Sequence, residues 1–534
     1  MKTSSTIKLI ATACVLSLCS TQTYAQTQPE AEATSNFTAY SKFRVTLKDK
    51  KNNEFSVKHP EAFLSQRAID RRKKQGIKID ETDLPVNRSY INAIAATGVK
   101  VIQTSKWNNT VVISVENDEL VQQVADLDCV SKVEKVAIYT APRKTNTADR
   151  HALVFPKQKQ DEVQTDTVEA GSEDLMKSDT LIFNPQTTSA NVFIGQMNDF
   201  LRKISKKLSS KPADSDEAEG EEEPELTYYG KAIKQITQLN GEALHAAGFK
   251  GEGKVIAIID GGFYNADIIP GLSKAKILGT KDFVAPEEEF YGTESHGMMV
   301  LSCIAANEPN KLVGMAPEAS FWLLRSEDGD TEQPIEEDNW ASAIEYADSV
   351  GADVVNTSLG YADFDGPFND VRYDELDGHS QLISNSASMC ADKGMVLVCS
   401  AGNSGNDQWK LITSPADSKN TLTVGAVSEH GGNTAFSSIG FTTDGRIKPD
   451  IATRGGDAWL YGTDGKVTTA SGTSFASPIA CGMVACLWQA LPNLTAKQIV
   501  EVVRKSGDRA EHPDPVYGCG IPDFFKAYSI GLAQ

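Results

Sequence analysis

The chain has 534 residues, of which 40% are hydrophobic and 7% aromatic, a composition typical of a globular protein with several domain-sized units. Its formal net charge of −20 argues against nucleic acid as a partner, because phosphate binding requires a cationic surface. The sequence contains no uninterrupted apolar run of about 18 residues, so it predicts no transmembrane helix.

The N-terminus has the pattern of an export signal. Two lysines precede the apolar run 9–19, and residues 23–25 (TYA) resemble a small-x-small cleavage site. These features predict a signal peptide over residues 1–25 and a periplasmic or extracellular location. Lipid anchoring through a cysteine of the apolar run is the alternative, but Leu18 before Cys19 is larger than lipoprotein signals prefer.

Residues 37–141 have the element order of a small α+β domain. The apolar pattern and the turn residues predict strands and helices in an order that suits a split β-α-β, ferredoxin-like unit. The expected elements are a strand at 41–47, a long helix at 60–76, a short helix at 89–98, two strands within 99–115, a helix at 117–127 and a strand at 132–140.

An acidic segment follows at residues 142–226. Eight of the twelve residues 214–225 are acidic, and such a composition cannot bury enough apolar surface to order itself, which predicts a flexible linker. One amphipathic helix is expected within it, at residues 192–208, with basic residues opposite its apolar face. Docking onto a neighbouring domain and lying on a membrane surface are the two interpretations of this helix.

From residue 227 to 534, apolar strands alternate with helical segments. This pattern predicts a doubly wound α/β domain with a mostly parallel sheet covered by helices on both faces. In such sheets, ligands bind and chemistry occurs at the carboxyl ends of the strands. The expected strands are residues 254–260, 320–326, 352–359, 395–401 and 421–427.

Cysteine usage gives no sign of a metal site. The sequence has nine cysteines but no CxxC and no His-rich tract. Cys481 and Cys486 lie five residues apart on one predicted helix and therefore point in different directions. We expect the cysteines after the signal peptide to be free thiols that act as small hydrophobic residues.

Four polar residues follow strands or open helices in the C-terminal domain. Asp260 ends a strand, His296 precedes an apolar helix, Asn403 lies in a Gly-rich turn after a strand, and Ser474 opens the last long helix. Each has a plain structural interpretation as a turn residue, a surface histidine or a helix cap. Together they are the groups that acyl transfer requires: a nucleophile, a base, a carboxylate that orients the base and an oxyanion donor.

The local sequences around these residues resemble those of subtilisin-like serine peptidases (subtilases). The chain order Asp, His, Ser is that of the family. The resemblance covers about residues 226–520, and the N-terminal domain resembles the family's inhibitory propeptide. The matching segments are "IAIIDGGF", "SHGMMV", "VVNTSLG", "CSAGNSG" and "SGTSFASPIACGMVA".

The resemblance implies a secreted endopeptidase that acts on proteins and peptides through an acyl-enzyme and is inhibited by its own propeptide until that is removed. Position by position, it assigns the catalytic triad to Asp260, His296 and Ser474 and the oxyanion donor to Asn403. It implies no cofactor. Calcium binding is possible in principle, but the sequence has no loop of clustered Asp and Asn that supports it. The implied substrate-binding residues are Ser358, Leu359, Gly360, Ala401 and Gly402.

Two residues depart from the family pattern. Gly261 stands where the family usually has Ser or Thr, and Met298 stands where it usually has Thr. These departures leave open the alternative of a catalytically weak or inactive binding protein with the subtilase fold. A nucleotide-binding enzyme does not fit, because Gly251 and Gly253 precede the strand instead of following it.

An acidic segment also suggests a substrate preference. Seven of the twelve residues 327–338 are acidic, and the resemblance implies that this segment lies beside the substrate as an added strand. We therefore expect a modest preference for basic side chains on the N-terminal side of the cleaved bond. The alternative is a solvated acidic loop without a role in binding.

Overall fold

The computed structural model describes residues 37–141 and 228–534. The predicted signal peptide, the linker at 142–226 and its amphipathic helix at 192–208 lie outside the described residues.

The N-terminal domain is a four-stranded antiparallel sheet with helices on one face. Its strand order, β2-β3-β1-β4, is that of the expected ferredoxin-like unit. Alternate residues of β1 are buried, so Phe43, Val45 and Leu47 form the core with the helices. The elements are β1 (Tyr40–Leu47), α1 (Gln66–Lys74), α2 (Arg88–Ala95), β2 (Lys100–Ser105), β3 (Thr110–Val115), α3 (Glu119–Ala125) and β4 (Val130–Tyr139).

The long helix expected at 60–76 is divided in the structure, so this prediction was wrong in its first half. A 3₁₀ turn covers Pro60–Ala62, and α1 begins only at Gln66. The reason is Ser65, whose hydroxyl accepts a hydrogen bond from Ala68 N at 3.2 Å and caps a new helix. The helix ends as expected before Gly76, which has a positive φ of 68°.

The C-terminal domain is built on a seven-stranded sheet in the order β15-β12-β11-β10-β5-β9-β6, and every neighbouring pair is parallel. This confirms the predicted fold class. The two edge strands, β6 and β15, were not predicted. The strands are β5 (Val255–Asp260), β6 (Lys276–Asp282), β9 (Ser320–Arg325), β10 (Val354–Thr357), β11 (Val396–Ser400), β12 (Leu422–Val427) and β15 (Ile451–Arg454).

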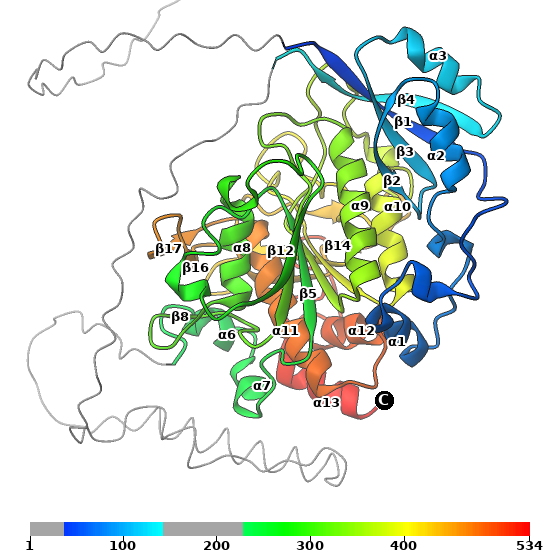
Figure 1. Ribbon diagram of the computed structural model, residues 1–534. Helices are drawn as coiled ribbons and strands as arrows, with labels where there is room; N and C mark the ends of the chain where they lie inside the picture. The colour runs from blue at the N-terminus through cyan, green and yellow to red at the C-terminus, as the bar shows by residue number, and fades with distance from the viewer. Residues whose placement is uncertain (1–36, 142–227) are drawn as a thin grey trace, which may run out of the picture. The chain divides into compact units, whose positions relative to one another are not determined.

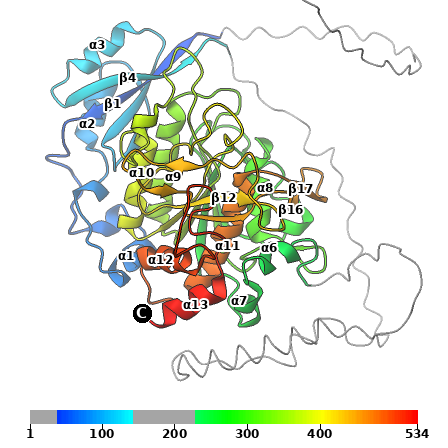
Figure 2. The ribbon, with the colours of Figure 1, turned by 180° about the vertical axis from the view of Figure 1, so that it is seen from behind.

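Helices cover both faces of this sheet (Figures 1 and 2). The central strand β5 shows how the faces are divided. Ile256 and Ile258 pack into one core cluster with α8 (His296–Ala305) and α11 (Thr473–Ala490). Ala257 and Ile259 face the opposite cluster, which includes residues of α9 (Ile335–Val350) and α10 (Leu382–Cys390).

The remaining elements are short strands and peripheral helices. They are α6 (Ile233–Thr237), α7 (Glu242–Ala246), β7 (Asn307–Glu308), β8 (Leu312–Val313), β13 (Gly440–Phe441), β14 (Ile447–Lys448), β16 (Ala458–Tyr461), β17 (Val467–Ala470), α12 (Ala496–Ser506) and α13 (Phe524–Leu532). Within residues 37–141 and 228–534, no helix is long and apolar enough to cross a bilayer. The cysteines of these residues are all free, as expected.

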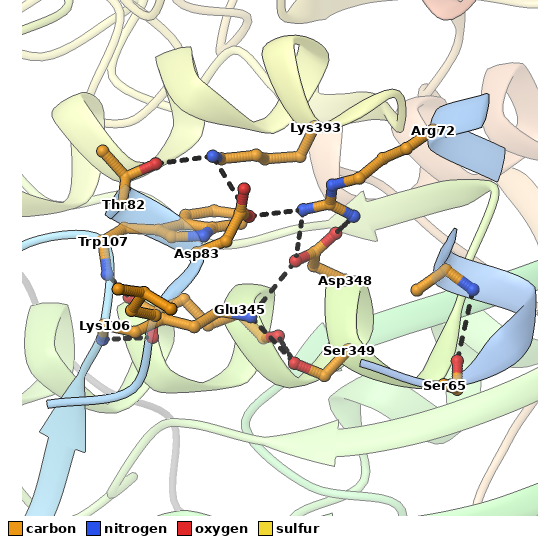
Figure 3. Close-up of polar contacts among 12 residues, drawn as sticks. Ser65, Arg72, Thr82, Asp83, Lys106, Trp107, Glu345, Asp348, Ser349 and Lys393 are labelled. Atoms are coloured by element: carbon orange, nitrogen blue, oxygen red, sulfur yellow. Dashed lines mark hydrogen bonds and ion pairs between the residues drawn. The ribbon is translucent and has the colours of Figure 1, made fainter. Parts of the chain in front are cut away.

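The N-terminal domain packs against α9, and α1, β1 and β2 all contact this helix. Trp107, directly after β2, is buried in the core cluster that α9 and α10 form on the sheet. Its backbone N–H donates to Glu345 Oε1 of α9 at 2.9 Å, and the N–H of Lys106 donates to Glu345 Oε2 at 2.7 Å (Figure 3). The contact therefore combines apolar burial with hydrogen bonds to a buried carboxylate.

Candidate active site

The predicted site residues meet at one edge of the seven-stranded sheet. The strands β5, β10 and β11 are parallel neighbours, so their carboxyl ends lie side by side. Asp260 is the last residue of β5, Ser358 follows β10, and Asn403 follows β11 after two residues. The helices α8 and α11 begin at the same edge, with His296 and Ser474 in their first turns.

Asp260 and His296 form a close pair. Asp260 is fully buried, and its Oδ1 lies 2.7 Å from His296 Nδ1. The same oxygen accepts a hydrogen bond from Gly261 N at 2.8 Å, which fixes the carboxylate. Burial alone would lower the pKa of the His296 imidazole, but the charge of Asp260 and the hydrogen bond to it outweigh burial and raise this pKa to about 9.

Ser474 is the second residue of α11 and is only 7% exposed. Its hydroxyl donates to the carbonyl oxygen of Ser358 at 3.2 Å, and not to His296. The hydroxyl would have to leave this acceptor before it could donate to the imidazole. Loose hydrogen bonds of this kind are common in catalytic sites without substrate.

Asn403 is oriented by the residue before Ser474. Its Oδ1 accepts hydrogen bonds from the backbone N–H of Thr473 at 2.9 Å and from the Thr473 hydroxyl at 3.0 Å. Because the oxygen of the amide is held in this way, the NH₂ group is left as the donor that can face the pocket. Thr473 therefore does not cap α11; it positions Asn403.

A buried chain of hydrogen bonds joins β10 to α11. Ser477 donates to Asn356 Oδ1 at 2.8 Å, Asn356 Nδ2 donates to Ser358 Oγ at 3.0 Å, and Ser358 Oγ donates to the carbonyl oxygen of Ser474 at 2.8 Å. All these side chains are buried. The chain fixes the start of α11 relative to the end of β10, which a positioned nucleophile requires.

A pocket of about 370 Å³ lies over this edge of the sheet. Eight of the nine predicted site residues line it: Asp260, His296, Ser358, Leu359, Gly360, Gly402, Asn403 and Ser474. The ninth, Ala401, is fully buried, and its side chain packs in a hydrophobic cluster with Leu376 and Ile412. The structure thus brings together the predicted residues, with the exception of the Ala401 side chain.

The pocket also has lining residues that sequence reasoning missed. Glu294 and Thr413 belong to it, whereas Glu327 and Glu332 come from the acidic segment singled out in the sequence. Glu294 lies two residues before His296, which was a signal that could have been used. Nothing in the sequence around Thr413 marks it as a pocket residue.

The two departures from the family pattern have different surroundings. Met298 is fully buried in the core cluster and does not line the pocket. Gly261 lines the pocket, and a Cβ at this position would lie only 2.9 Å from Glu294 Oε2. Gly261 therefore leaves room for a carboxylate, and neither departure removes a group needed for acyl transfer.

Fold and site together define a peptidase of the serine type. A model described as the subtilase family matches residues 251–520, about half of the chain, and a model of the peptidase S8 propeptide domain of Bacteroidota matches residues 42–151. The chain belongs to the subtilase family and carries a propeptide domain. Proteins of this family are serine-type peptidases.

Curated relatives agree with this family. Serine protease AprX of Bacillus subtilis (strain 168) is 28% identical over 336 residues, which are 55% of this chain and 72% of the relative. Subtilisin DY of Bacillus licheniformis is 28% identical over 269 residues, which are 49% and 87% of the two chains. A crystal structure of MycP1 with the N-terminal propeptide removed aligns with 23% identity and a TM-score of 0.44, covering 55% of this chain and 96% of that chain.

Proposed function

We propose that this subtilase is an exported endopeptidase that hydrolyses peptide bonds through an acyl-enzyme formed on Ser474. The observation that carries the proposal is the 2.7 Å contact between Asp260 and His296 in a pocket that Ser474 and Asn403 also line. A buried carboxylate on one imidazole nitrogen leaves the other nitrogen free to take a proton from a serine.

In the proposed mechanism, Ser474 turns from the Ser358 carbonyl toward His296 and attacks the scissile carbonyl carbon. His296 takes the hydroxyl proton and then gives it to the leaving amine, while Asp260 stabilises the imidazolium. The amide of Asn403 and the backbone N–H of Ser474 donate to the oxyanion of the tetrahedral intermediate. Water then repeats the sequence on the acyl-enzyme and releases the second product.

The position of Ser474 supports this role beyond its hydrogen bonds. The first backbone N–H groups of a helix have no partner within the helix, and the helix dipole favours negative charge at this end. Ser474 stands in the first turn of α11, a helix of 18 residues. An oxyanion that forms on a substrate bound to Ser474 would therefore lie at a favourable helix terminus.

We further propose that the N-terminal domain inhibits the peptidase and is removed during maturation. The last strand of this domain, β4, contacts the segment that contributes Glu332 to the pocket: Ile138 N donates to Gln333 Oε1 at 2.7 Å, and Gln333 follows Glu332 in the chain. The proposed limits are residues 1–25 for the signal peptide, 37–141 for the propeptide, 142–226 for the linker and 227–534 for the peptidase. The expected cut lies between residues 141 and 230.

The alternative of an inactive binding protein has no observation in its favour. It depends on Gly261 and Met298, and Met298 lies in the core, away from the pocket. The groups that acyl transfer requires are all present.

The proposal is tested by expressing the full chain beside its Ser474→Ala variant, with Ser273→Ala as the control for an exposed serine. We expect the wild type and the control to be shortened on a gel and to hydrolyse casein, and the Ser474→Ala protein to remain full length and inactive. N-terminal sequencing of the shortened product locates the cut, and a serine-directed phosphonylating reagent is expected to block activity. Equal processing and equal casein hydrolysis by all three proteins would overturn the proposal.

A further inference from the structure

One wall of the active-site pocket is rich in carboxyl groups. Glu294, Glu327 and Glu332 line the pocket together with the predicted catalytic residues. No lysine or arginine lines this pocket, and none of the three carboxylates forms a salt bridge within the part of the chain that the structure describes. A pocket of this kind favours a cationic ligand group.

Two glycines make room for Glu294. A Cβ at Gly329 would lie 1.4 Å from Glu294 Oε1, and a Cβ at Gly261 would lie 2.9 Å from Glu294 Oε2. Any side chain at Gly329 would therefore displace the carboxylate. Glu294 lies over two glycines, and one of them is Gly261, the residue that departs from the family pattern.

Glu327 approaches the same place from the other side. A Cβ at Gly261 would lie 3.7 Å from Glu327 Oε2, so this oxygen and Glu294 Oε2 converge over one backbone position, directly after Asp260. The buried Tyr361 donates its hydroxyl to Glu327 Oε1 at 2.6 Å. One oxygen of Glu327 is thus held by the protein, and the other faces the region shared with Glu294.

The surroundings of these carboxylates disfavour their charge in the absence of a ligand. Burial and the charge of Glu332 raise the pKa of Glu327 to about 8, and burial and the charge of Asp365 raise the pKa of Glu332 to about 7. Behind them, Glu336 is 1% exposed, and its Oε2 has no hydrogen-bond partner. A cation that enters the pocket relieves this repulsion.

One hydroxyl in the pocket lacks a hydrogen-bond partner within the described residues. Thr413 is 6% exposed, lines the pocket, and its hydroxyl makes no hydrogen bond within the described residues. Unpartnered buried hydroxyls are rare because they cost free energy, so this one indicates a group that arrives with the ligand. Thr413 lies between Gly360 and Gly402. A Cβ at Gly360 would lie 2.1 Å from the Thr413 hydroxyl oxygen, and a Cβ at Gly402 would lie 3.0 Å from it.

We propose that the substrates of this peptidase carry a lysine or arginine on the N-terminal side of the cleaved bond, and that Glu294, Glu327 and Glu332 bind this side chain. The inference rests on the proposed function, because it names the substrate class of the same pocket. The segment that holds Glu327 and Glu332 follows β9, where the resemblance to subtilases places the substrate as an added strand. Thr413 occupies the space between Gly360 and Gly402. The carboxylates therefore bind a substrate side chain next to the one that enters between these two glycines.

The test uses internally quenched peptides that differ only at one of the three residues before the cleaved bond. At each position, Lys is compared with Met, and Arg with citrulline, which has nearly the same shape without the charge. With the processed product of the full chain at low salt, we expect kcat/KM to be about tenfold higher for the charged peptide at one position at least, and the ratio to fall as salt is added.

Isosteric variants separate charge from shape. Glu294→Gln, Glu327→Gln and Glu332→Gln are tested singly and together, and Gln at position 327 keeps the acceptor for the Tyr361 hydroxyl. We expect the triple variant to lower the ratio of charged to neutral peptides to about twofold or less. Glu511→Gln changes an exposed carboxylate outside the pocket and is the control for net charge.

The outcomes distinguish the inference from the proposed function. Equal cleavage of charged and neutral peptides by an active wild type, or a preference that survives in the triple variant, overturns the inference alone. If none of the hydrolysis depends on Ser474, the proposed function is overturned. In that case the inference falls with it, because it rests on the proposed function.

Discussion

Arg72 of the N-terminal domain and Asp348 of α9 form a buried ion pair between the two domains, with Arg72 Nη1 2.8 Å from Asp348 Oδ1 (Figure 3). Neither side chain is more than 1% exposed. Arg71 binds the same carboxylate, and Lys106 Nζ lies 3.2 Å from its other oxygen. Burial alone would raise the pKa of Asp348, but the charges of Lys106, Arg72 and Arg71 hold it well below its usual range. One carboxylate of the peptidase domain thus neutralises cations from two segments of the propeptide.

The first prediction concerns this carboxylate. Asp348→Asn leaves buried cations without their partner, and breaking a buried ion pair costs about 3–5 kcal/mol. We expect the N-terminal domain to separate from the peptidase domain at lower urea concentration in full-length protein that also carries Ser474→Ala to prevent cleavage. Tryptophan fluorescence follows the separation, because Trp107, one of six tryptophans, is buried at the contact.

The matched control is Asp392→Asn, because Asp392 pairs with Lys497 at 2.6 Å on the surface. Both side chains are more than half exposed, and such pairs contribute about 0–1 kcal/mol. If the N-terminal domain separated from the peptidase domain at the same urea concentration in both variants, this interpretation of the contact would be contradicted.

The second prediction concerns the oxyanion donor. Asn403→Ala removes the amide that Thr473 orients, and the loss of one such donor lowers kcat by about 10²–10³. KM is expected to change little, because the donor acts mainly in the transition state. Steady-state kinetics with one peptide substrate measures both constants.

The role of Thr473 provides a second measurement at the same place. Thr473→Val removes the hydroxyl that donates to Asn403 Oδ1 but leaves the backbone N–H that donates to it as well. We expect a fall in kcat smaller than that of Asn403→Ala. An increase of KM alone in both variants would mean that Asn403 binds the ground state and is not an oxyanion donor.

Much of this site could be predicted from the sequence, for a physical reason. Near-continuous apolar strands indicate a parallel sheet, and a parallel sheet brings its carboxyl ends to one edge. Asp260 and Asn403 could therefore be placed together although 142 residues lie between them. The position of His296 and Ser474 at helix starts completed the prediction.

The acidic wall could not be predicted in full, because it depends on contacts between loops. Glu294 reaches across Gly329 only through the fold of two separate loops. The structure divides the acidic segment 327–338 into two parts. Glu327 and Glu332 line the pocket, whereas Asp338 belongs to α9 and binds Arg44 of the propeptide at 2.7 Å.

The third prediction is the pH dependence of hydrolysis. A general base must be neutral, and the pKa of His296 is raised to about 9. Below this pH the imidazole is protonated, so kcat/KM is expected to rise about tenfold per pH unit and to level off above about pH 9. The profile is measured with an uncharged peptide, and circular dichroism checks that the protein stays folded over the range. A midpoint near the ordinary histidine value of about 6.5 would contradict the effect of Asp260 on the imidazole.

The fourth prediction concerns the depth of the pocket. Thr413 lies between Gly360 and Gly402, so it limits the size of the substrate side chain that enters between these two walls. Thr413→Gly is expected to raise kcat/KM for a peptide with Phe or Leu directly before the cleaved bond by about tenfold relative to the peptide with Ala, because one added methylene in a hydrophobic pocket contributes about 1–3 kcal/mol.

Thr413→Val separates the two properties of this side chain, since it keeps the volume and removes the unpartnered hydroxyl. If volume sets the preference, the valine variant retains the wild-type ratio of Ala to Phe peptides while the glycine variant reverses it. Without substrate, the Thr413→Val protein is also expected to be at least as stable as the wild type, because it no longer buries a hydroxyl that lacks a partner. If both variants change the ratio equally, the hydroxyl and not the volume determines which side chain the pocket accepts.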